Sequence, residues 1–80
     1  MIIYSQGGQC PYQAEGKIGN DYFYFRSRGN NISLELYRTK KDLEELENQK
    51  IYILIKAKQT WLTDEQAIKY IKKLYKKLKA

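Results

Sequence analysis

The side chains best suited to catalysis in this 80-residue chain are Cys10, Glu15 and Asp21. The sequence contains no histidine, so no Ser–His or Cys–His pair can activate a nucleophile, and most zinc sites are excluded as well. Cys10 is more typical of a small buried apolar residue. Glu15 and Asp21 are expected to balance Arg26 and Lys17 across neighbouring strands rather than to work as an acid–base pair. The sequence therefore predicts a protein that is not an enzyme and uses no cofactor and no metal.

A run of alternating aromatic and basic residues is the second chemical feature. Residues 22–28 read YFYFRSR, and strand alternation sends Tyr22, Tyr24, Arg26 and Arg28 to one side. Tyrosine rings stack on bases and arginines contact phosphates, but both residue types are also enriched in protein-binding hot spots. The run lacks the Lys/Arg-Gly-aromatic order of an RNA-recognition motif. A protein partner is the first interpretation, and DNA or RNA is the alternative.

Basic charge is concentrated in the second half of the chain. Fifteen Lys and Arg residues against nine Asp and Glu residues give a net charge of +6. The candidate contacts to phosphate or another polyanion are Lys69, Lys72, Lys73, Lys76 and Lys77. Lysine is also the ordinary polar residue of a solvated helix face. The apolar face of this segment lacks Trp and Phe, and no apolar run approaches a membrane span, so we expect no membrane role.

The first half of the chain has the alternation typical of strands. Turn residues lie at Gly19-Asn20-Asp21 and at 29–31, and we expect Gly7 to Pro11 to form a loop. The strands are expected at 2–4, 12–18, 22–28 and 32–37.

The second half predicts two helices and a further strand. A short helix is expected within 39–48, with Thr39 as its N-cap. Residues 51–55 (IYILI) are the most β-prone run, which predicts a central strand buried on both faces. The direction of this strand stays open, because the link before it is long enough for a crossover. Thr63 and Gln66 form a capping-box pattern at the start of an amphipathic C-terminal helix.

Together these elements predict one α+β domain over residues 1–80. It consists of a small antiparallel-dominated sheet of four to five strands, with the C-terminal helix packed on one face and the short helix in the 39–48 connection. The core is expected to contain Phe23, Phe25, Leu34, Leu36, Ile51 and Ile53, with Trp61 at one end. The opposite face is expected to show Tyr22, Tyr24, Arg26 and Arg28, and it carries four tyrosines if Tyr37 and Tyr52 face the same way.

Two segments resemble a shared core of short proteins of bacteriophages and other mobile elements. They are CPYQAEG at residues 10–16 and FYFRSRG at residues 23–29, which match a C-P-x-Q-A-E-G…F-Y-F-R-x-R-G pattern. Residues 61–65 (WLTDE) are loosely similar to the start of the closing helix in that group, while the lysine-rich middle and tail depart from it. Small proteins of this kind often bind host machinery, including defence complexes such as CRISPR effectors. The resemblance implies no activity that can be assigned to single residues.

The leading hypothesis is a non-catalytic binding protein that docks on a host protein or nucleoprotein complex and blocks it, as an anti-CRISPR would. Direct nucleic-acid binding through the Tyr/Arg face and the lysine helix is the alternative, and a homodimer stays open. A single cysteine favours the reducing cytoplasm. The expected partner-binding residues are Gln13, Glu15, Tyr22, Tyr24, Arg26 and Arg28. The motif can equally be a folding signature, with Glu15 paired to Arg26 or Arg28.

Overall fold

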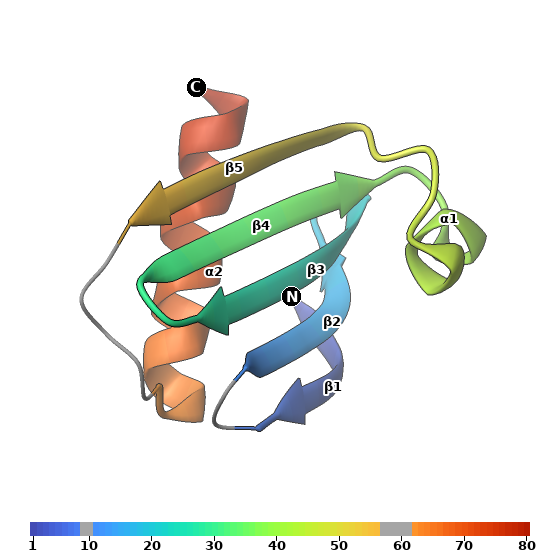
Figure 1. Ribbon diagram of the computed structural model, residues 1–80. Helices are drawn as coiled ribbons and strands as arrows, with labels where there is room; N and C mark the ends of the chain where they lie inside the picture. The colour runs from blue at the N-terminus through green and yellow to red at the C-terminus, as the bar shows by residue number, and fades with distance from the viewer. Residues whose placement is uncertain (9–10, 57–61) are drawn as a thin grey trace.

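The computed structural model describes residues 1–8, 11–56 and 62–80. A five-stranded sheet has the order β1-β2-β3-β4-β5, with every strand antiparallel to its neighbours (Figure 1). The elements are β1 Ile2–Gly7, β2 Tyr12–Ile18, β3 Asp21–Arg28, β4 Asn31–Tyr37, α1 Lys40–Glu45, β5 Ile51–Lys56 and α2 Asp64–Lys79. This is the α+β fold that the sequence predicts, including the short helix in the connection before β5.

Two tight turns set the register of the central three strands. Gly19 and Gly29 have φ near +58°, a conformation that costs glycine little. The turns pair Ile18 with Asp21 and Arg28 with Asn31. Because side chains alternate along a strand, this register decides which residues face α2.

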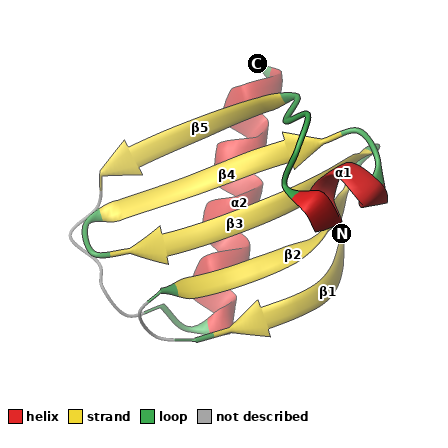
Figure 2. Cartoon of the chain, turned by 45° about the vertical axis from the view of Figure 1, so that its right-hand side comes forward, coloured by secondary structure: helices red, strands yellow, loops and turns green. Residues whose placement is uncertain are grey.

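The core lies between the sheet and α2, which crosses one face of it (Figure 2). The predicted core residues Phe23, Phe25, Leu34 and Leu36 are fully buried, which confirms that part of the prediction. They pack with the buried face of α2, formed by Ala67, Ile71 and Leu74, and with Tyr12, Ala14, Ile18 and Ile32.

Helix α2 begins at the predicted capping box. The Thr63 hydroxyl accepts a hydrogen bond from the Gln66 backbone at 3.1 Å, and the Gln66 side chain accepts one from the Thr63 backbone at 3.0 Å. The Tyr12 hydroxyl donates to Asp64 Oδ1 at 2.7 Å, which ties the start of the helix to β2. Desolvation and this carboxylate raise the pKa of Tyr12, so its phenol stays protonated.

The prediction of a buried central strand at 51–55 is wrong. β5 is an edge strand antiparallel to β4, and the exposed fractions of Ile51, Tyr52 and Leu54 are 41%, 58% and 56%. The link that contains α1 folds back beside β4 instead of crossing to the middle of the sheet (Figure 1). β1 is longer than expected and reaches Gly7, with a register shift between Ile3 and Ser5. The expectations for Cys10 and Trp61 lie outside the described residues.

Candidate partner-binding face

The sheet face opposite α2 is called here the outer face, and α1 covers part of it (Figure 2). Leu43 of α1 is buried and packs in one cluster with Tyr24 and Tyr37, against which Tyr22 is half-buried. The prediction of a freely exposed tyrosine face is therefore wrong for Tyr24 and Tyr37. A helix this short needs an apolar surface for its one buried leucine, and the tyrosine rings supply that surface.

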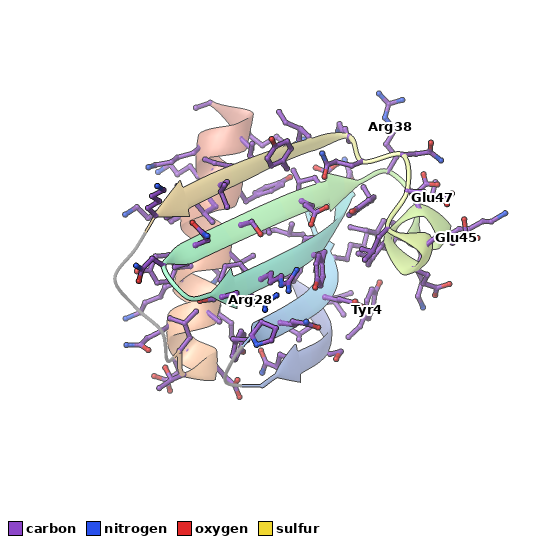
Figure 3. All side chains as sticks on the ribbon, viewed as in Figure 1. Tyr4, Arg28, Arg38, Glu45 and Glu47 are labelled. Atoms are coloured by element: carbon purple, nitrogen blue, oxygen red, sulfur yellow. The ribbon has the colours of Figure 1, made fainter. Side chains whose placement is uncertain are left out.

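Hydrogen bonds and ring contacts tie together the side chains under and beside α1, of which Tyr24 and Tyr37 are buried. The Tyr37 hydroxyl donates to Glu35 Oε1 at 2.8 Å, and burial together with this carboxylate raises the pKa of Tyr37. The ring of Tyr4, which is labelled in Figure 3, stacks on Tyr22 with centroids 6.5 Å apart. Lys40 Nζ of α1 lies 4.9 Å from the Tyr4 centroid. These side chains hold α1 in place, so they do not form a free binding surface.

The rest of the outer face stays open and is called here the open half. It consists of Gln13, Arg26, Arg28, Asn31, Ser33, Tyr52 and Leu54. Two hollows of about 200 and 310 Å³ adjoin there and share Ser33 and Leu54. Asn31, Ser33 and Leu54 are not among the predicted partner-binding residues. The alternation of β4 is the signal that places Asn31 and Ser33 here, whereas the sequence predicts a buried strand at Leu54.

The two arginines of the open half have no acidic partner. In the described part of the chain, all ion pairs within 4.0 Å connect Asp21 to lysines. The expected Glu15–Arg26 or Glu15–Arg28 pair is therefore wrong. The register explains this, because Gln13 lies opposite Arg26 while Glu15 lies opposite Tyr24. Of the predicted partner-binding residues, the open half brings together Gln13, Arg26 and Arg28.

Asp21 occupies a buried site on the opposite side of the sheet from Glu15. Its exposed fraction is 2%, with Lys50 Nζ at 3.0 Å, Lys79 Nζ at 2.8 Å and the Tyr75 hydroxyl donating at 3.3 Å. Burial alone raises the pKa of Asp21, but the hydrogen bonds and charges of Lys79 and Lys50 outweigh it and lower the pKa below its ordinary value. The surface balance expected for Asp21 is wrong, since its side chain joins β3 to Lys50, the residue before β5, and to Tyr75 and Lys79 of α2.

Glu15 and Asp21 cannot work together as an acid–base pair, because the sheet lies between their side chains. No group of three or more metal-binding residues occurs within 1–8, 11–56 and 62–80. Neither of the helices described is long and apolar enough to cross a membrane.

The predicted lysine row lies on the far side of the molecule from the open half. Lys69, Lys72, Lys73, Lys76 and Lys77 are all exposed on α2, which covers the other face of the sheet. None of the five has a carboxylate within 4.0 Å among the described residues. One flat partner therefore cannot contact the arginines and the lysine row together.

Comparison of the chain with protein-family models, with curated protein sequences and with solved structures finds no match. Its function is therefore inferred from its own residues.

Proposed function

We propose that this chain is a small non-catalytic protein that docks on another protein through the open half of its outer face. The observation that carries the proposal is the pair of exposed apolar side chains, Tyr52 and Leu54, beside two arginines that have no acidic partner within 1–8, 11–56 and 62–80. Tyrosine and arginine dominate binding hot spots, and an apolar centre with polar surroundings is the usual anatomy of an interface.

The free edge of β5 extends this surface. β5 pairs with β4 on one side and no described strand pairs with its other side, so its backbone can accept an added strand. The other edge strand, β1, has a register shift between Ile3 and Ser5 that disturbs regular pairing. β5 has no such irregularity along Ile51–Lys56. A partner can therefore contact both the side chains of the open half and the adjoining strand edge.

The charge of the surface favours an acidic partner. The chain carries +6, and Arg26, Arg28 and Lys56 lie on or next to the open half. A second copy would bring another +6 and is the weaker candidate. The phage-type resemblance suggests a host protein or nucleoprotein complex in the cytoplasm, which docking would block, as an anti-CRISPR does.

Direct nucleic-acid binding is the second candidate, and the exposed lysine row of α2 favours it. Two of the tyrosines that would stack on bases, Tyr24 and Tyr37, are buried under α1. Lysines without stacking rings contact phosphates only, so such binding should fall steeply with salt.

Fluorescence anisotropy separates the two candidates. Labelled single-stranded DNA, duplex DNA and RNA are titrated with the protein at about 50 and 200 mM salt. We expect binding that disappears at the higher salt and weakens in Lys73→Glu but not in Tyr52→Ala. Binding that survives the higher salt and requires Tyr52 would favour nucleic acid as the true ligand.

Affinity capture from a bacterial host lysate tests docking itself. We expect one partner in defined stoichiometry. Lys73→Gln should capture as much of it as the unchanged chain, and Tyr52→Ala should reduce the captured amount more than tenfold. Lys73→Gln is a control on the opposite surface of the molecule. Equal capture by Tyr52→Ala and the unchanged chain would contradict docking through the open half.

A further inference from the structure

An unmet hydrogen-bond donor marks one end of the open half. The Nε atom of Arg26 is buried from solvent and has no hydrogen-bond partner among the residues that the structure describes. Neither Arg26 nor Arg28 has a carboxylate within 4.0 Å in the described part of the chain. A buried donor without an acceptor is unfavourable.

The side chains around this donor form a hollow of about 200 Å³. Arg26 and Arg28 are two residues apart on β3, so they lie on the same face, and Figure 3 labels Arg28 there. On β4, Ser33 lies opposite Arg26 and Asn31 lies opposite Arg28. Leu54 of β5 completes the lining. Two guanidinium groups, an amide and a hydroxyl thus surround a space with one apolar wall.

We propose that this hollow binds a single carboxylate group of the partner protein, held by Arg26 and Arg28. The inference rests on the proposed docking function and names the group that the partner supplies. Arginine presents paired N–H donors that match the two oxygens of a carboxylate. Asn31 and Ser33 can donate further hydrogen bonds, and Leu54 can pack against the methylene groups that carry the carboxylate.

Neighbouring charges favour one carboxylate over a phosphate chain. Tyr24 is the residue next to Arg26 on the outer face of β3. Glu15 of β2 and Glu35 of β4 lie opposite Tyr24, on the same outer face. A nucleic-acid strand that ran along the sheet from the arginines would bring further phosphates near these two carboxylates. A single carboxylate at the arginine end avoids this repulsion.

The hollow at Asp21 does not offer an equivalent site. Arg38, Lys50 and Lys79 line it, but Asp21 already binds both lysines. The arginine hollow, in contrast, has no acidic side chain among the described residues that line it.

The test is a titration of the isotope-labelled full chain followed by NMR. The probe is N-acetylglutamate α-amide, which carries one side-chain carboxylate, and N-acetylglutamine α-amide is its uncharged control. We expect a saturable shift of the Arg26 Nε–H resonance in the millimolar range with the carboxylate probe only. Arg28→Gln should weaken this binding at least tenfold. Lys73→Gln removes the same charge from the far side of the molecule and should leave it unchanged.

Three results would overturn the inference. The first is equal shifts of the Arg26 resonance with both probes. The second is an equal loss of affinity for the carboxylate probe in Arg28→Gln and Lys73→Gln. The third is no shift of the Arg26 resonance at about 100 mM carboxylate probe. A parallel titration with inorganic phosphate that shifts Arg26 when the carboxylate probe does not would overturn it in favour of a phosphate ligand. Capture that still requires Tyr52 after a failed titration would leave docking in place and refute the carboxylate site alone.

Discussion

The division of the outer face depends on one buried side chain, Leu43 of α1. Leu43 is the buried residue of a six-residue helix, and its exposed fraction is 2%. It packs in one cluster with Tyr24 and Tyr37. We expect Leu43→Ala to release α1 from the sheet and expose both tyrosines. Leu46→Ala is the matched control, because it removes the same atoms at a position that is 50% exposed.

The magnitude follows from the size of this cluster. Buried Leu→Ala substitutions cost about 2–5 kcal/mol, and a cluster this small at the sheet surface places Leu43 near the lower value, about 2 kcal/mol. Domains of this size have only about 3–5 kcal/mol of stability from their core, so the loss is a large part of the total. Leu46→Ala, as a surface substitution, should stay within about 0.5 kcal/mol.

Urea denaturation followed by circular dichroism measures this difference. With a slope of about 1–2 kcal/mol per molar urea, the midpoint for Leu43→Ala should fall by about 1–2 M. A second readout is the phenol of Tyr37, followed by carbon NMR at alkaline pH. Its pKa, raised by burial and by Glu35, should fall toward the ordinary value in Leu43→Ala. Equal midpoints for the two variants, with an unchanged Tyr37 pKa, would refute the packing of α1 described above.

Three further perturbations test how the fold is held. Asp21→Asn should cost about 1–3 kcal/mol at pH 7. Because the pKa of Asp21 is lowered in the folded state, its contribution to the free energy of unfolding is present above its ordinary pKa and is lost as the pH falls through the folded value. Urea denaturation between pH 7 and pH 2 should therefore show a smaller loss of stability with acid in the variant. An equal loss in both proteins would contradict the assignment. Gly16→Ala should cost about 1–3 kcal/mol and speed amide exchange in β1, since the new Cβ collides with the Ile2 carbonyl oxygen; unchanged exchange there would count against this contact. Thr63→Ala should remove about 1 kcal/mol and lower the melting temperature by several degrees, and no change would mean that the capping box does not stabilise α2.

Local signals made the hairpins and α2 predictable from the sequence. The Gly-Asn turns fix the register of β2, β3 and β4, and the capping box with a 3.6-residue period fixes α2. The position of β5 was not predictable in this way. Residues 51–55 are strongly β-prone, but propensity does not say whether a strand lies in the centre of a sheet or at its edge. The path of the link between β4 and β5 decides whether β5 is central or at the edge. In the structure it places β5 at the edge, with Tyr52 and Leu54 at the surface.

The candidate site was predictable only in part. Alternation along β3 placed Arg26 and Arg28 on the outer face, where the structure has them. The burial of Tyr24 depends on α1 folding over the outer face, and no local pattern shows which face a linking helix covers. The burial of Asp21 was readable, because it shares its side of β3 with Phe23. An acidic residue beside a turn is more commonly a surface residue, and the sequence prediction follows that tendency.

Site-specific photo-crosslinking most directly tests docking through the open half. A photoreactive amino acid replaces Leu54 in one variant and Lys73 in another, and each is irradiated in a bacterial host lysate. We predict a discrete protein adduct at position 54 that excess unmodified chain suppresses and that excess Tyr52→Ala does not, with no such adduct at position 73. A competed adduct at position 73 alone, or adducts of nucleic acid only, would contradict docking through this face.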